Sequence, residues 1–186
     1  MTNSPHYWKK AKLYLSKKDK VMKYLIKKYD DTTLSTRKDV FYSLCKSIIG
    51  QQISVAAANS VFSKFNIACK KKITPRNVKK LGILKLKKCG LSKQKAIGIK
   101  ELSIRFLNKS FDPNLIFNMD DEEAIEYLST LRQIGRWSAE MILLFTFNRS
   151  NIWPIQDIGL LRAISKNFRT VSLPLNKVFD CKQHSQ

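Results

Sequence analysis

The sequence predicts an all-α protein, and three observations lead to this fold class. Apolar residues recur at helical spacing in one segment after another, and most of these segments begin at a residue type that favours helix N-caps. No convincing pair of alternating strands is found. The chain has six glycines and five prolines in 186 residues, too few for an all-β architecture with its many turns. At this length a sizeable core forms without disulfide bridges.

In chain order, six helices are predicted to begin at capping signals: Asp19, Asp39, Ser54, Thr74 with Pro75, Ser92, and the capping box of Asp120 with Glu123. Each signal is followed by apolar residues three or four positions apart, such as Val21, Met22, Leu25 and Ile26 after the first. Gly50 and Gly82 are expected to end the second and fourth of these helices. Two further helices are predicted, over roughly 137–148 and after Asp157.

The charge of the chain favours a polyanionic partner. Lys and Arg number 35 against 14 Asp and Glu, which gives a net charge of +21. A surplus of this size is typical of proteins that bind nucleic acid or an anionic membrane surface. The alternative is a lysine-rich composition without such a partner. No apolar run is long enough for a transmembrane helix, and Met1–Lys10 lacks the apolar region of a secretory signal.

The four cysteines do not form a recognisable metal site. Cys45, Cys69, Cys89 and Cys181 are scattered, and no two have Cys-x2-Cys spacing. We therefore expect free thiols, without a zinc site or an iron–sulfur cluster.

One segment, Leu131-Arg-Gln-Ile-Gly-Arg-Trp-Ser-Ala-Glu-Met141, joins two predicted helices by a tight connection. Gly135 is expected to supply either a positive φ or a close backbone approach. The N–H groups at the start of the following helix can bind a phosphate without any charged side chain. Such turns are also common as plain connectors, so this segment alone leaves both readings open.

A second segment, Trp153-Pro-Ile-Gln-Asp-Ile-Gly-Leu-Leu-Arg162, places Asp157 where the last helix would start. Taken alone, this aspartate is most simply an N-cap, because its carboxylate can accept backbone N–H bonds.

Together the two segments resemble the helix-hairpin-helix DNA glycosylase superfamily, and within it the 3-methyladenine DNA glycosylase II group. The stretches Ile48-Ile-Gly-Gln-Gln-Ile-Ser-Val-Ala-Ala57 and Gly90-Leu-Ser-Lys-Gln-Lys-Ala96 match the same group. Four motifs in this order are far more specific than any one of them, and the resemblance covers roughly residues 7–168.

The resemblance implies a base excision repair enzyme that hydrolyses the N-glycosidic bond of alkylated purines after flipping the base out of the duplex. Asp157 matches the essential aspartate, which stabilises positive charge on the sugar and orients or activates a water. Trp137 occupies the position where bifunctional relatives carry a Schiff-base lysine, so a monofunctional enzyme is expected. Its indole can stack on the flipped base, and Met141 can line the same pocket; the alternative for both is a core residue.

The resemblance also implies how DNA is held. Gln52, with Ile53 and Ser54, would enter the duplex and fill the gap left by the flipped nucleotide. The hairpin residues Ile134, Gly135, Arg136 and Trp137 would hold the DNA backbone. A monovalent cation, Na+ or K+, is expected at the carbonyls of Leu131 and Ile134. The expected partner is alkylated double-stranded DNA bound by a monomer, with no membrane partner. The protein would be located in the cytoplasm, at the nucleoid, in a bacterium and in the nucleus of a eukaryote.

Two departures from the family pattern bear on the fold. Relatives usually have Gly-x-Gly in the hairpin, whereas Gln133 stands at the first glycine; a positive φ there would cost about 1 kcal/mol or more. The terminal helical segment of the family is also missing from 170–186, which predicts a shortened C-terminal lobe.

We expect one glycosylase domain over 1–186, with a central lobe over 36–145 and a second lobe from 1–35 plus 146–186. Two other functions remain open. One is a catalytically weak or silent helix-hairpin-helix DNA-binding protein, and the other is a glycosylase for a different lesion.

Overall fold

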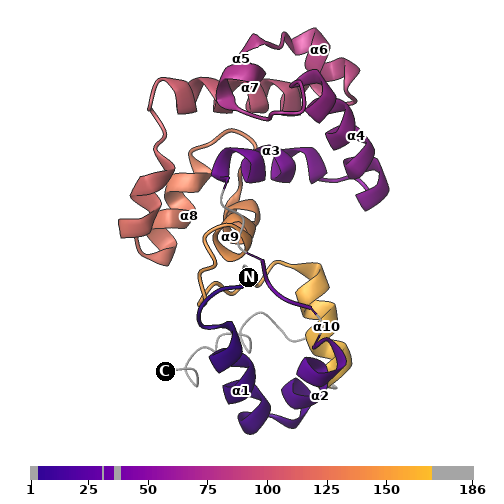
Figure 1. The fold of residues 1–186 in the computed structure, drawn as a ribbon, viewed down its shortest axis with the longest axis vertical. Coiled ribbons are helices and arrows are strands. Elements are labelled where there is room, and N and C mark those ends of the chain that lie inside the picture. The colour runs from indigo at the N-terminus through magenta and orange to yellow at the C-terminus, as the bar shows by residue number, and fades with distance from the viewer. Residues whose placement is uncertain (1–3, 31, 36–38, 169–186) are drawn as a thin grey trace. The chain divides into compact units, whose positions relative to one another are not determined.

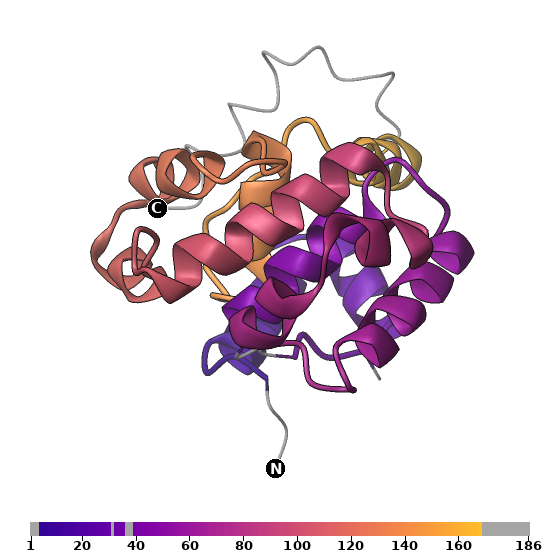
Figure 2. The same ribbon diagram turned by 90° about the horizontal axis from the view of Figure 1, so that it is seen from above.

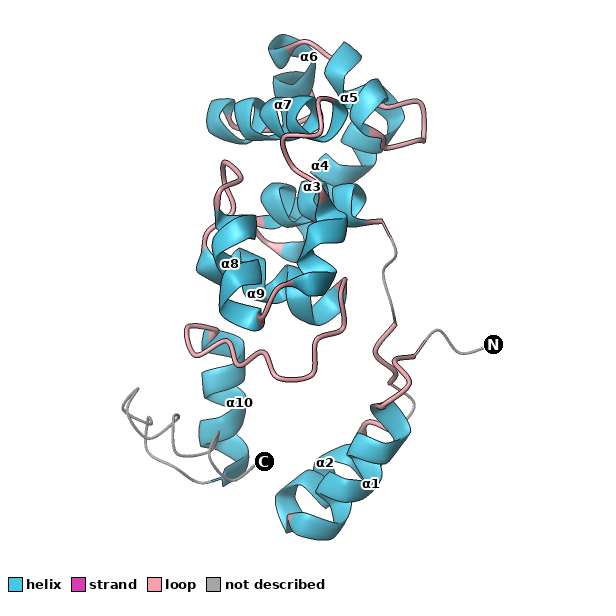
Figure 3. Ribbon diagram, turned by 90° about the vertical axis from the view of Figure 1, so that its left-hand side faces the viewer, coloured by secondary structure: helices cyan, strands magenta, loops and turns pink. Residues whose placement is uncertain are grey.

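A computed structural model of the protein describes residues 4–30, 32–35 and 39–168. Within these ranges every regular element is a helix (Figure 3), so the predicted all-α fold class is confirmed. Cys181 and the predicted shortening of the C-terminal lobe lie outside the described residues. No described helix combines the length and the hydropathy that crossing a membrane requires.

The helices fall into two units (Figure 1). The terminal unit takes its helices from both ends of the sequence: α1 (Trp8–Lys18), α2 (Lys20–Lys28) and α10 (Ile158–Phe168). The central unit, residues 37–152, contains the rest: α3 (Val40–Gly50), α4 (Val55–Ala68), α5 (Pro75–Lys80), α6 (Ile83–Lys88), α7 (Lys93–Leu107), η1 (Pro113–Asn118), α8 (Asp121–Ser129) and α9 (Arg136–Phe145).

The core of the central unit is built around α7. This helix packs against α5, α6 and α3, and α3 in turn packs against α4 and α9 (Figure 2). The largest fully buried side chains come from most of these elements, including Leu44, Ile48, Phe65, Leu86, Ile99, Ile116, Leu128 and Leu143. Because α7 and α3 contribute to one core, the segments at their ends are held in fixed positions within this unit.

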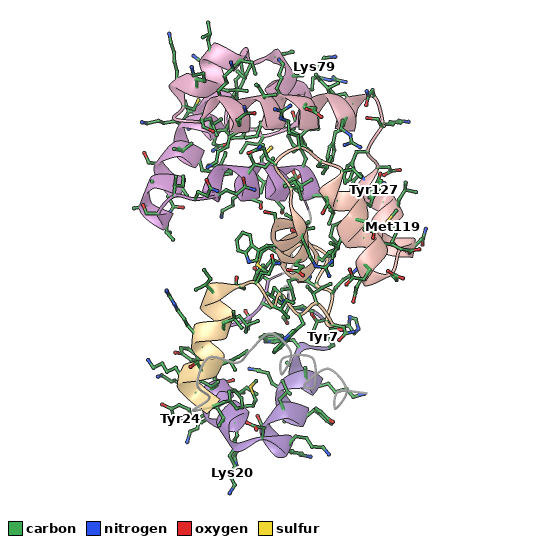
Figure 4. All side chains as sticks on the ribbon, turned by 180° about the vertical axis from the view of Figure 1, so that it is seen from behind. Tyr7, Lys20, Tyr24, Lys79, Met119 and Tyr127 are labelled. Carbon is green, nitrogen blue, oxygen red and sulfur yellow. The ribbon has the colours of Figure 1, made fainter. Side chains whose placement is uncertain are left out.

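Residues 146–152 belong to the central unit, although we expected them in the second lobe. Arg149 holds them there: its guanidinium donates to Asp121 Oδ1 at 2.7 Å and to the carbonyls of Ile116 and Met119 at 2.6 and 2.7 Å. Nearby, Tyr127 stacks on Phe111 with ring centroids 4.7 Å apart, and its hydroxyl accepts the Asp112 N–H at 2.9 Å (Figure 4).

All six predicted capping signals are confirmed. In each case the side chain accepts the backbone N–H of the residue three positions later, and at Asp120 and Glu123 both bonds of the capping box form. Gly50 is the last residue of α3, as expected.

Other local predictions need correction. Gly82 does not simply end a helix: α5 ends at Lys80, and Gly82 is the N-cap of α6, which was not predicted. The helices α1 and η1 were also missed. Helix α9 ends at Phe145 rather than near 148, because Asn148 has a left-handed φ of 53°.

The three described cysteines are buried free thiols, as predicted. Burial raises the pKa of Cys45 well above its usual value and raises that of Cys69 to about 11. Thiols with such pKa values stay protonated and unreactive at neutral pH.

The terminal unit has a thinner core. No residue of α1, α2 or α10 is fully buried. The apolar faces of α1 and α2 meet around a hollow of about 220 Å³, lined by Trp8, Leu15, Met22 and Leu25 among others. An ion pair between Lys12 and Asp30, at 2.7 Å, joins the middle of α1 to the chain just after α2.

Candidate functional site

The predicted hairpin is formed by α8 and α9 and the turn between them. Leu131 and Ile134 anchor the turn, because their side chains are buried and the Ile134 N–H donates to the Leu131 carbonyl at 3.0 Å. Of the residues expected to hold DNA, Ile134 can therefore contribute only its backbone.

The positive φ of the turn lies at Gln133, not at Gly135. Gln133 has φ 71°, whereas Gly135 has φ −94° and ψ 177°, which any residue adopts. Of the two alternatives expected for Gly135, the positive φ is therefore excluded, and the strain falls on the residue that departs from the family pattern. A non-glycine residue in this region costs roughly 1–2 kcal/mol.

A glycine on a neighbouring helix makes room for Gln133. A Cβ added to Gly98 of α7 would lie 2.8 Å from Gln133 Cγ and 3.4 Å from the Arg132 carbonyl oxygen. Because Gly98 has no side chain, the side chain of Gln133 has room beside α7.

The N-terminus of α9 is left open by its own sequence. Gly135 is the N-cap and offers no side chain to accept the first N–H groups of the helix. A Cβ added to Gly135 would meet nothing within 4 Å. The turn borders an open hollow of about 410 Å³, lined by residues 129–135 and Glu101. Glycine is thus required here by neither φ nor internal packing, and the position is open to close approach by another molecule.

Arg136 faces carboxylates rather than solvent anions. Its guanidinium lies 2.7 Å from Glu122 and 3.3 Å from the buried Glu140. The hydrogen bond to Glu122 is the main cause that raises the pKa of Arg136. Its charge is therefore balanced within the hairpin, and a phosphate would meet the backbone N–H of Arg136 rather than its side chain.

Trp137 is not a core tryptophan. It is 40% exposed in the first turn of α9, whereas Ser138, Ala139 and Glu140 beside it are buried. Met141, one turn later, is half-buried. An aromatic face and a thioether are thus accessible on one side of the helix that follows the hairpin.

Gln52, Ile53 and Ser54, which are predicted to fill the gap in the duplex, lie in the loop between α3 and α4. We call this loop, residues 51–54, the plug loop. Gln52 is exposed and has φ 55°, so the chain reverses sharply at this residue. Ile53 is 41% exposed, and the Ser54 hydroxyl caps α4 by accepting the Ala57 N–H at 3.2 Å. The loop therefore presents an amide and an apolar side chain to solvent, while Ser54 has a structural role.

Two further residues, Gln51 and Lys95, connect this loop to the other motifs. Gln51 Nε2 donates to the Gln133 carbonyl at 2.6 Å and to Ser138 Oγ at 3.3 Å. Lys95 Nζ donates to the carbonyls of Ile49 and Gln51 at 3.0 and 2.6 Å, and burial lowers the Lys95 pKa. Three of the four family-like motifs are thus joined by side chain to backbone hydrogen bonds. The sequence contains one sign of this role, since Lys95 and Gln51 both lie inside the motifs that they join.

Asp157 belongs to the terminal unit and precedes α10. Its Oδ1 accepts the Leu160 N–H at 2.7 Å, which is the capping bond expected from the simplest reading. A Cβ added to Gly159 would lie 3.0 Å from the same oxygen. Glycine two residues after the aspartate therefore gives the carboxylate room to fold back over the helix.

Comparison with known proteins shows the family of this chain. Residues 45–176 match the family model described as HhH-GPD superfamily base excision DNA repair protein. The alkylbase DNA glycosidase-like protein mag2 of Schizosaccharomyces pombe is 31% identical over 90% of this chain and 81% of its own length. DNA-3-methyladenine glycosylase of Saccharomyces cerevisiae is 33% identical over 71% of this chain and 48% of its own.

Solved structures share the fold. The 3-methyladenine DNA glycosylase of S. pombe in complex with abasic DNA is 24% identical and has a TM-score of 0.76. The alignment covers 92% of this chain and 86% of that one. The 3-methyladenine DNA glycosylase of Archaeoglobus fulgidus is 28% identical with a TM-score of 0.73, over 92% of this chain and 62% of that one. With most of its length matched by the family model and by these relatives, the chain belongs to the HhH-GPD superfamily of base excision DNA repair proteins.

Proposed function

We propose that the protein is a monofunctional DNA glycosylase that releases alkylated purines, of the 3-methyladenine type, from duplex DNA. The observation that carries this proposal is the open N-terminus of α9. Gly135 leaves it without a side-chain cap and without any neighbour for a Cβ, and the exposed Trp137 follows two residues later. The relatives named for alkylated bases support the substrate class.

In this proposal the hairpin holds the DNA backbone. A phosphate binds the N–H groups at the start of α9, where the helix dipole favours negative charge. The carbonyls of Leu131 and Ile134 would hold Na+ or K+ beside it. The Leu131 carbonyl accepts one hydrogen bond, from Ile134, and a carbonyl oxygen has two lone pairs, so this donor set fits a cation. Contacts of this kind carry no sequence information, so selectivity comes from the flipped base.

The plug loop replaces the flipped base. Gln52 enters the duplex, and Gln51 and Lys95 act as positioning residues because they fix the loop against the hairpin. The flipped, electron-poor purine then stacks on Trp137, where a cation over an aromatic face gains about 0.5–2 kcal/mol. Met141 lines the same pocket.

Asp157 supplies the chemistry. As the glycosidic bond breaks, positive charge develops on the sugar, and a carboxylate beside C1′ stabilises that charge and orients the attacking water. A cationic alkylated purine is a good leaving group, so one carboxylate suffices. No amine replaces it at the hairpin position, because that residue is Trp137 and an indole cannot form a Schiff base.

The decisive experiment is single-turnover base release from methylated duplex DNA by wild type and Asp157→Asn. Asparagine caps helices as well as aspartate does, so the bond to the Leu160 N–H persists while the charge is lost. We expect DNA affinity to be retained and excision to fall by at least two orders of magnitude. Asp19→Asn, the same change at the N-cap of α2 in the same unit, is the control and should excise normally.

Three results would contradict the proposal. Excision by Asp157→Asn within tenfold of wild type would remove Asp157 from the chemistry. Full DNA affinity in the wild type without any base release would identify a DNA-binding protein instead of an enzyme. Borohydride should trap no protein–DNA adduct, and a trapped adduct would refute the monofunctional reading.

A further inference from the structure

The central unit carries its charge very unevenly along the chain. From residue 40 to residue 100 there are fourteen Lys or Arg residues and no Asp or Glu, although the whole chain has 14 acidic residues. A general lysine bias would enrich lysine throughout, but it would not clear every carboxylate from 61 consecutive residues. The distribution therefore points to a surface on which negative charge is disfavoured.

Twelve of these fourteen side chains are exposed. The other two, Lys95 and Lys100, are half-buried and donate to backbone carbonyls, Lys100 to those of Lys79 and Leu81. None of the twelve forms an ion pair with a carboxylate in the described part of the chain. Their mutual repulsion is thus not relieved within the unit.

A hollow between α4 and α6 gathers three of these lysines. Lys64, Lys85 and Lys88 surround it, and Ile67, Ala68 and Cys89 form the rest of its lining, with a volume of about 230 Å³. Burial raises the pKa of Cys89 even though Lys85 and Lys64 act to lower it. The thiol is therefore neutral, and the charge of the hollow comes from the lysines alone.

A short stretch of the chain connects the hollow to the plug loop. Lys88 ends α6, and five residues later Lys93 begins α7, a separation of at most ~18 Å for extended chain. Two residues further, Lys95 is bonded to the Gln51 carbonyl at the start of the plug loop. One helical turn of B-DNA spans about 34 Å, so the hollow lies within about a turn of duplex from the plug. Figure 4 shows Lys79, at the end of α5, on the same α5–α6 end of the central unit.

We propose that the α4–α6 hollow is a second DNA contact, at which Lys64, Lys85 and Lys88 bind neighbouring backbone phosphates of the duplex flanking the lesion. This inference rests on the proposed function, because it assumes that DNA is held at the hairpin and plug loop. The second contact binds DNA independently of sequence and away from the reacting base. It therefore lengthens the residence time on DNA without changing the rate of base release.

The test compares two triple variants with wild type. Lys64→Gln/Lys85→Gln/Lys88→Gln removes three charges, and Lys64→Arg/Lys85→Arg/Lys88→Arg keeps them. Affinity for a 24-base-pair undamaged duplex is measured as a function of salt, since each phosphate contact adds roughly 0.9 to the slope of log K against log salt. We expect the Gln variant to lose about two to three from the slope and at least tenfold in affinity near 0.1 M salt.

The Arg variant should keep both the slope and the affinity. Lys109→Gln, at an exposed lysine beyond the far end of α7, should also bind as wild type does. Single-turnover base release at saturating protein should be the same in the Gln variant and in wild type.

The outcomes separate the two proposals. A Gln variant with wild-type slope and affinity, in a protein that binds DNA, overturns the second contact and leaves the glycosylase proposal standing. A Gln variant that excises slowly at saturation also overturns it, because the hollow would then belong to the catalytic machinery. A wild type without DNA affinity overturns the proposed function itself, and the second contact with it.

Discussion

The fit between Gly98 and Gln133 predicts a measurable coupling between two distant positions in the sequence. Gly98 lies inside α7, where glycine is less favourable than alanine by roughly 0.5–1 kcal/mol. Gly98→Ala should nevertheless fail to stabilise the protein, because its Cβ would lie 2.8 Å from Gln133 Cγ. Crowding of this kind typically costs about 1–3 kcal/mol.

Gln133→Gly removes the atom that causes the crowding. It also relieves the left-handed φ of 71°, a gain of roughly 1 kcal/mol that is partly offset by the greater freedom of glycine in the unfolded chain. The backbone carbonyl that accepts Gln51 is kept. In this background Gly98→Ala should stabilise by about 0.5–1 kcal/mol, since of the three nearest atoms only the Arg132 carbonyl oxygen, at 3.4 Å, remains.

The assay is urea unfolding of wild type, both single variants and the double variant. We expect a coupling energy of at least about 1 kcal/mol, with the double variant more stable than the sum of the singles. Gly82→Ala, whose Cβ would meet nothing within 4 Å, is the control and should be additive with Gln133→Gly. Additivity of Gly98→Ala and Gln133→Gly within about 0.5 kcal/mol would refute the reasoning.

Three further predictions follow from the same geometry. Gly135→Ala should leave the melting temperature nearly unchanged, because neither φ nor space opposes a Cβ, whereas the affinity for DNA should fall. Unchanged DNA affinity would show that the turn only connects the two helices. Lys95→Met should destabilise by about 1–3 kcal/mol, because it leaves the carbonyls of Ile49 and Gln51 without their donor; calorimetry showing no loss would contradict this. Stability should fall between pH 9 and about 11, because folding raises the pKa of Cys69 from 9.0 to about 11 and the unfolded state loses its proton first. Cys69→Ala should flatten this limb of the pH profile, and an identical profile would refute the assignment.

Local signals explain why the sequence analysis placed most helix starts correctly. A capping side chain such as Asp39 or Ser54 acts on N–H groups two or three residues away, so its effect is visible in the sequence. Helix α1 lacks such a signal: its N-cap is Tyr7, whose side chain makes no cap bond. Gly82 was read as a stop because a glycine is compatible with either side of a helix boundary.

The turn of the hairpin could not be predicted in the same way. The positive φ at Gln133 depends on Gly98 and Gln51, which are 35 and 82 residues away in the chain. The family pattern pointed to the correct segment and to the strained position. It did not indicate which neighbours accommodate the strain, because those contacts arise only in the packed unit.

The two kinds of lysine in the central unit should differ in chemical reactivity. Between residues 40 and 100 eleven lysines are exposed, whereas Lys95 and Lys100 donate to the carbonyls that end α3 and α5. An amine-directed reagent in limiting amount should label the eleven first and the two last. Labelling of Lys95 and Lys100 should then accelerate when the protein unfolds, so these two amines report on the folding of the central unit independently of DNA.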